Sequence, residues 1–123
     1  MSNDDLKLNE LFGEPIASYT RAQALNDGTL VDVTAAAAVI GYKLPVAITA
    51  SLSAWLAGGS EDVAPIILDN MLFQVLLGLR RHKSDSRCEL RITMPWGTEP
   101  VIIDCGPGDD AKPVLTMGFA LDF

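Results

Sequence analysis

The chain has 123 residues, of which 49% are hydrophobic and 20% charged, and its formal net charge at pH 7 is −7. This composition is typical of one globular domain with a core of its own, and it excludes a disordered chain. The acidic balance argues against direct binding to nucleic-acid backbones, which requires clustered Lys and Arg. An acidic surface attracts basic partners or simply maintains solubility.

The start of the chain is acidic and polar, whereas a secretion signal is basic and then apolar. The longest apolar stretches, such as residues 35–40, are too short to cross a bilayer. Cys88 and Cys105 lack the close spacing of a zinc site. We therefore expect a cytoplasmic protein with reduced thiols, no membrane contact, and no metal or other cofactor.

The first predicted element is a short helix that begins after Thr20. Thr20 and Gln23 have the spacing of a capping box, in which each end of the first helical turn satisfies a backbone donor of the other. Gly28 can adopt the left-handed conformation that ends many helices. A short strand over residues 29–33 is expected to follow.

Two further threonines are placed to cap short helices. Thr34 is expected to cap a helix over residues 35–40, and Thr49 a helix over residues 50–56. The segment 44–48 between them contains a proline, which cannot donate to a central ladder, so it is expected to be extended and to form an edge strand.

The longest predicted helix covers residues 66–81, with Pro65 in its first turn. Polar residues recur at helical spacing and leave one broad apolar face for the core. That face comprises Leu68, Met71, Leu72, Val75, Leu76 and Leu79. His82 follows within a basic run, where we expect a solvated helix end.

The last forty or so residues change to the two-residue alternation of half-buried strands. Three runs show it, over residues 88–94, 101–105 and 115–121, and turn residues separate them. They predict an antiparallel meander.

The predicted fold class is α+β. A small antiparallel sheet, made of the three-stranded C-terminal meander plus short N-terminal strands, packs against one long helix and several short helices. Residues 16–123 are expected to form a single domain, and residues 1–15 a loosely held N-terminal arm.

The segment 19–33, YTRAQALNDGTLVDV, resembles the signature of a family of short, uncharacterised bacterial proteins that are often carried on plasmids and phages. A weaker similarity continues at residues 41–49, GYKLPVAIT. It returns at residues 106–109, where the family has a Gly-Pro-Gly-Asp turn before a final strand. The resemblance implies a bacterial protein of a mobile element. The family has no established activity, so the resemblance transfers no catalytic residue.

The motif marks one polar cluster, formed by Tyr19, Arg21, Asp27 and Asp32. Its carboxylates and guanidinium could hold a ligand or a basic group of a partner. Alternatively, Arg21 pairs with Asp27 or Asp32 and fixes the helix to the strand, which is the interpretation we favour because a capping box and a turn already account for these residue types. Both interpretations stay open at this point.

Other candidate residues lie in turns. Trp96 falls at a hairpin turn and could anchor a protein interface, whereas Trp55 is expected to pack in the core. Asp109 and Asp110 belong to a predicted strand-to-strand turn, and a weak divalent-ion site there stays open.

A single histidine removes most catalytic and metal-binding constellations. No catalytic residue and no metal ligand is therefore predicted. We expect a non-enzymatic module that binds an unidentified protein; homo-oligomerisation is left open. One alternative is an acidic inhibitor or nucleic-acid mimic that acts on a host defence or nucleic-acid-binding system. A second is an enzyme of unknown chemistry.

Overall fold

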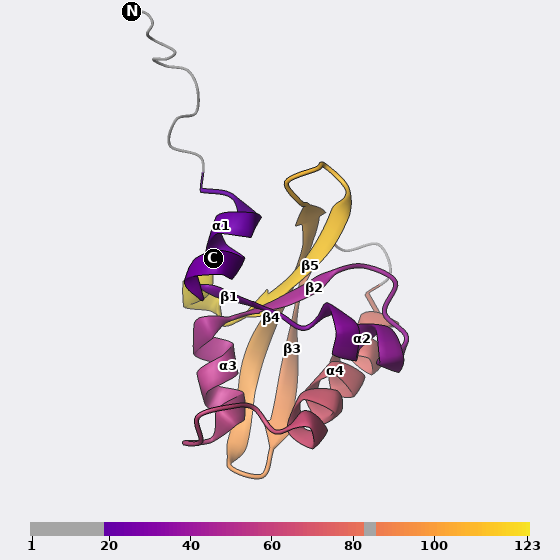
Figure 1. The fold of residues 1–123 in the computed structure, drawn as a ribbon. Coiled ribbons are helices and arrows are strands. Elements are labelled where there is room, and N and C mark those ends of the chain that lie inside the picture. Colours follow the sequence, from indigo (N-terminus) through magenta and orange to yellow (C-terminus); the bar gives the residue numbers. More distant parts are fainter. Residues whose placement is uncertain (1–18, 83–85) are drawn as a thin grey trace, which may run out of the picture.

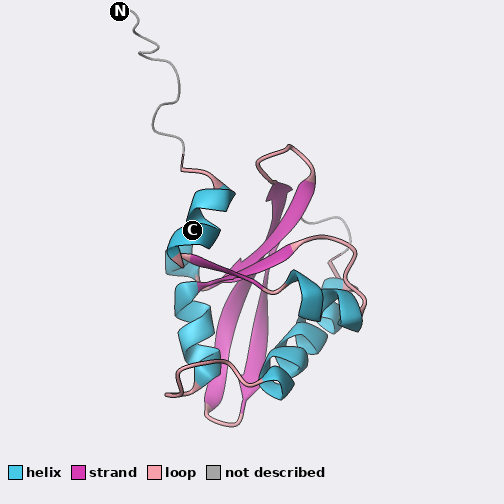
Figure 2. Ribbon diagram, viewed as in Figure 1, coloured by secondary structure: helices cyan, strands magenta, loops and turns pink. Residues whose placement is uncertain are grey.

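The computed structural model describes residues 19–82 and 86–123, so the expected arm over residues 1–15 lies outside the described residues. The helices are α1 (Arg21–Asp27), α2 (Thr34–Ile40), α3 (Ala50–Ala57) and α4 (Pro65–Leu79), with a short 3-10 helix, η2 (Ala120–Asp122), near the C-terminus (Figure 1). The strands are β1 (Leu30–Asp32), β2 (Val46–Thr49), β3 (Arg87–Met94), β4 (Gly97–Pro107) and β5 (Pro113–Gly118) (Figure 2).

The strands form one five-stranded sheet in the order β1-β2-β5-β4-β3. The predicted α+β class and the antiparallel meander of β3, β4 and β5 are confirmed. The sheet is mixed rather than wholly antiparallel, because β2 and β5 run parallel. Parallel neighbours need a long crossover connection, and here α3, α4, β3 and β4 all lie between β2 and β5 in the chain.

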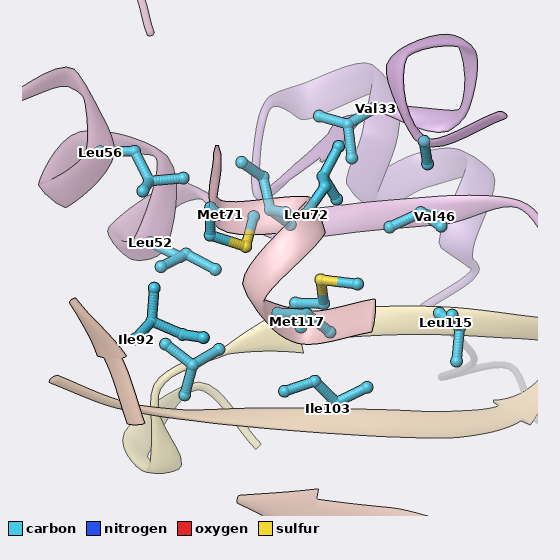
Figure 3. Packing of buried hydrophobic residues seen from close by; sticks show 14 of the residues in the cluster. Val33, Val46, Leu52, Leu56, Met71, Leu72, Ile92, Ile103, Leu115 and Met117 are labelled. Atoms are coloured by element: carbon cyan, nitrogen blue, oxygen red, sulfur yellow. The ribbon is translucent and has the colours of Figure 1, made fainter. Parts of the chain in front are cut away.

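The core lies between one face of the sheet and the helices α2, α3 and α4. Figure 3 shows apolar side chains from α3, α4 and the strands gathered in this layer. The predicted apolar face of α4 is confirmed: Met71, Leu72 and Val75 are fully buried. The rest of that face, Leu68, Leu76 and Leu79, packs partly buried against the same cluster.

Most of the predicted helix boundaries are confirmed. Thr20 forms a capping box with Gln23, and α1 ends at Gly28 with φ of 87°. The hydroxyl of Thr49 accepts a hydrogen bond from the amide of Leu52 and so caps α3. Pro65 opens α4.

Thr34 does not cap α2 as predicted. The N-cap residue is Val33, and Thr34 is the first residue of the helix. The Thr34 hydroxyl donates to Asp32 at 2.6 Å and accepts from the Val46 amide at 3.0 Å. It therefore joins the end of β1 to the start of β2 instead of capping a helix.

The segment 44–48 is extended in part as predicted, since β2 covers Val46–Thr49, but its predicted edge position is wrong. The observed strand, β2, lies between β1 and β5, and all four of its residues are buried. Pro45 precedes the strand and uses its carbonyl, which accepts a hydrogen bond from the Leu115 amide at 2.9 Å. A proline needs no amide hydrogen in that position, so it does not force the strand to the edge.

The other face of the sheet, here called the outer face, carries polar residues. Paired residues on adjacent strands share a face, and the register places Asp32, Ala47, Thr116, Asp104 and Arg87 in one row across all five strands. In the described part of the chain, no helix is long and apolar enough to cross a membrane.

Candidate functional site

The motif residue Arg21 fixes α1 to the outer face of the sheet. Its guanidinium donates to the Thr116 hydroxyl at 2.7 Å and to the Leu115 carbonyl at 2.9 Å, both in β5. Burial lowers the pKa of Arg21, while the charges of Asp32 and Asp109 oppose that shift. The sequence predicted a pairing with Asp27 or Asp32, but the hydrogen bonds reach β5 instead of β1.

The turn between β4 and β5 also binds α1, through the side chain of Asp109. The Asp109 carboxylate accepts hydrogen bonds from the backbone amides of Arg21 and Ala22, each at 2.9 Å. These bonds lower the pKa of Asp109 and satisfy two of the unpaired amides at the start of α1. Residues 19–33 and 106–109, which are far apart in the sequence, therefore meet in space.

The other members of the predicted cluster also bond within the chain. The Tyr19 hydroxyl donates to the Asp27 carboxylate, which raises the pKa of Tyr19 and lowers that of Asp27. The Asp32 carboxylate accepts from the amide and the hydroxyl of Thr34, and these bonds lower its pKa. The cluster surrounds the ends of α1 and β1, and each of its polar groups has an internal partner.

The second turn aspartate, Asp110, accepts a hydrogen bond from the Lys112 amide at 3.1 Å. Within residues 19–82 and 86–123, His, Cys, Asp and Glu form no group of three or more that could hold a metal ion. Asp109 already uses both oxygens at α1, so the turn works as a strand connection that also caps a helix.

A groove of about 500 Å³ lies on the outer face beside the C-terminus. Its most connected polar residue is Asp122, whose carboxylate accepts from Thr49, Ser51 and the Phe119 amide, each at 2.7 Å. Burial tends to raise the pKa of Asp122, but these hydrogen bonds outweigh it and the pKa is lowered. The groove is lined by groups that already satisfy one another.

Trp96 lies at the tip of the β3–β4 hairpin and is 44% exposed. Its ring meets that of Trp55 edge to face, with the centroids 6.3 Å apart, and lies against Gly58 at the end of α3. Trp55 packs against the core as predicted. One side of Trp96 is therefore covered, and the rest of the ring remains accessible.

A stripe of exposed apolar side chains on α4 was not predicted. Ile66, Phe73 and Leu77 of α4 are 75%, 53% and 45% exposed. Their spacing of seven and then four residues places them on one stripe, opposite the buried face of the helix. The composition of α4 could have indicated this exposure. Its only polar residues are Asp69, Asn70 and Gln74. A helix at the border of a small domain cannot bury every side, so some of its apolar residues must be exposed.

Basic side chains border this stripe. Arg80 and Arg81 follow α4, and Arg91 lies on the neighbouring strand β3. All three are exposed, and none forms an ion pair within the described residues. A groove of about 380 Å³ between α4 and β3 is lined by Gln74, Leu77, Gly78, Arg81, Leu90 and Arg91. We call the stripe, these arginines and the groove the α4–β3 surface.

Comparison of the chain with protein-family models, with curated proteins and with solved structures finds no match. The functional argument therefore depends on the geometry of the chain itself. In that geometry, internal bonds occupy the predicted motif cluster, whereas the α4–β3 surface presents exposed apolar and arginine side chains that no other described residue covers.

Proposed function

We propose that this protein is a non-enzymatic module that binds another protein through the α4–β3 surface. The observation that carries the proposal is the exposed stripe of Ile66, Phe73 and Leu77 on a helix whose opposite face forms the core. Contiguous exposed apolar side chains bordered by polar ones mark interaction sites in soluble proteins.

The arginines that border the stripe define the chemistry of the partner. In a chain with net charge −7, Arg80, Arg81 and Arg91 place three positive charges beside the apolar side chains, against the two carboxylates of Asp69 and Glu89 on the same elements. Arginine is enriched in protein interfaces, and complementary charges guide association and select the partner. The partner segment is therefore apolar and carries carboxylates.

The resemblance of residues 19–33 to a plasmid- and phage-borne family supports a bacterial setting for this partner, with the protein encoded on a mobile element and acting in the cytoplasm. The acidic-mimic alternative needs carboxylates available along one face. Asp27, Asp32, Asp109 and Asp122 all accept hydrogen bonds from their own chain, which gives that alternative less support.

Affinity capture from a bacterial host extract tests the proposal, with the chain carrying Phe73→Ser and Leu77→Ser together. Leu121→Ser is the matched control, because Leu121 is fully exposed in η2 and lies outside the α4–β3 surface. We expect the double variant to have the melting temperature of the parent. It should capture at least about tenfold less of the partner than the parent does.

The control should retain the same protein at the parent level. If the double variant captures the partner as well as Leu121→Ser does, the α4–β3 surface is not the binding site. Loss of capture in both variants would also count against it.

A further inference from the structure

The α4–β3 surface borders one edge of the sheet, because β3 is a terminal strand in the order β1-β2-β5-β4-β3. An edge strand presents backbone groups that no neighbouring strand satisfies, and such edges accept added strands from partners. The direction of the backbone groups in β3 can be read from three hydrogen bonds near its two ends.

Just before β3, the carbonyl of Ser86 accepts a hydrogen bond from the Cys105 amide of β4 at 2.7 Å. The backbone groups of Ser86 therefore point toward β4. At the other end of β3, the backbone amide and carbonyl of Thr93 point away from β4. Its amide donates to the Gln74 side chain at 2.9 Å, and its carbonyl accepts from the same side chain at 2.8 Å. Since the direction alternates along a strand, Arg87, Glu89 and Arg91 also point their backbone groups outward.

The Gln74 amide occupies the edge at Thr93 in the way that a neighbouring strand would. Its Nε2 atom also donates to Asn70 at 2.7 Å, which fixes the orientation of the side chain. Among the residues that the structure describes, Gln74 therefore closes the edge at Thr93, and none bonds to the outward backbone groups of Arg87, Glu89 and Arg91.

The groove beside this open edge suits an extended segment. Gly78 lets α4 approach β3 closely, since a Cβ atom there would lie 2.6 Å from the Leu90 side chain. An added strand would have exposed Leu77 on its inner side and the Arg91 guanidinium on its outer side, with Arg81 bordering the groove.

We propose that the partner binds as an added β-strand along β3, with its end set by Gln74, its apolar side chains over Leu77 and a carboxylate opposite Arg91. This inference rests on the proposed function and specifies the partner as an extended segment with one carboxylate for Arg91. Exposed Glu89 shares the face of Arg91, so the residue opposite Glu89 is not acidic. Cross-strand pairs of opposite charge favour such a register, and alternate residues of the segment then face the two sides of the sheet.

The test uses short random peptides displayed on phage and selected on the parent protein. We expect selected peptides to carry apolar residues at alternate positions and an acidic residue at the position opposite Arg91. Binding is then measured to Glu89→Pro and to its matched control, Glu89→Ala. Proline removes the outward amide and blocks a ladder, and it is tolerated on an edge strand where that amide is unbonded.

The expected result is at least about a tenfold loss of peptide affinity in Glu89→Pro and little change in Glu89→Ala. Amide exchange in the parent gives a second readout that needs no substitution. The amides of Glu89 and Arg91 should become protected when a selected peptide binds, while the Leu90 amide, which points toward β4, should be protected throughout.

Equal peptide affinity in the two variants, unchanged exchange at Glu89 and Arg91, or failure to select any peptide would overturn strand addition. If Phe73→Ser with Leu77→Ser still abolishes partner capture in that case, the proposed function stands and only the strand geometry fails. If that double variant also captures normally, both proposals fail.

Discussion

At the residue scale, the polar side chains of the N-terminal motif bond to the fold itself. Thr20 caps α1 within its own turn, Arg21 reaches β5, and Asp109 returns from the last hairpin to the start of the same helix. Since α1 buries only Ala24, these polar contacts, more than apolar packing, hold it on the sheet. The polar residues of the motif therefore serve to attach one helix to the sheet.

Thr20→Ala should lower the free energy of unfolding by about 1 kcal/mol, because the capping hydroxyl at the start of α1 is lost. Thr20→Ser keeps a hydroxyl in the same position and should unfold close to the parent. Urea denaturation midpoints measure both variants. Coinciding midpoints for Thr20→Ala and the parent would show that the capping box contributes nothing.

Acid should weaken the fold. The pKa values of Asp27, Asp32, Asp109 and Asp122 are all lowered in the folded chain by hydrogen bonds to their carboxylates. Such groups stabilise the fold fully above their unfolded pKa of about 3.9, and the contribution is lost as the pH falls through the folded values.

The urea midpoint should therefore fall as the pH drops below about 4. Asp109→Asn should show a smaller acid-dependent fall than the parent, because it has one fewer carboxylate to protonate. An equal or steeper fall in Asp109→Asn would mean that its bonds to α1 do not contribute to the acid response.

At the element scale, local signals predicted most of the helices and strands. Capping residues, the glycine after α1 and the two-residue alternation of the meander act between near neighbours in the chain, so one sequence is enough to read them. The position of β2 is different. It depends on β5 arriving beside it from the far end of the chain, and no local pattern encodes that pairing.

The role of Thr34 and the exposed side of α4 were missed for related reasons. Thr34 had a helix-capping pattern, but the Val46 amide of β2 competes for its hydroxyl. The buried face of α4 was predicted from its period, whereas exposure of Phe73 depends on which elements remain to cover it. The sequence could therefore indicate that α4 has more apolar residues than its buried face needs, but not which of them are exposed.

Gly78→Ala should destabilise the protein by about 1–3 kcal/mol, because the added methyl group meets the Leu90 side chain at 2.6 Å. Helix propensity alone predicts the opposite sign, a gain of up to about 1 kcal/mol. Urea unfolding of Gly78→Ala, Leu90→Ala and the double variant forms a double-mutant cycle.

In that cycle, Gly78→Ala should lower the free energy of unfolding less in the Leu90→Ala background than in the parent. A stabilising Gly78→Ala would show that α4 can move away from β3 without cost. The groove between them would then not be a fixed feature of the molecule.

At the scale of the whole molecule, the two faces of the sheet have different roles. The outer face carries α1, η2 and polar side chains that bond to one another, whereas the inner face supports α4, whose far side is exposed. Figure 1 shows that α1 and α4 lie at opposite sides of the fold. Attachment of the motif and capture of a partner can therefore be tested separately.

Amide hydrogen exchange, measured on the chain alone and in complex with its captured partner, tests the binding surface most directly. We expect slower exchange in α4 and along the outward amides of β3, and unchanged exchange in residues 19–34. Slower exchange confined to residues 19–34, with α4 and β3 unaffected, would contradict it and would assign binding to the motif cluster instead.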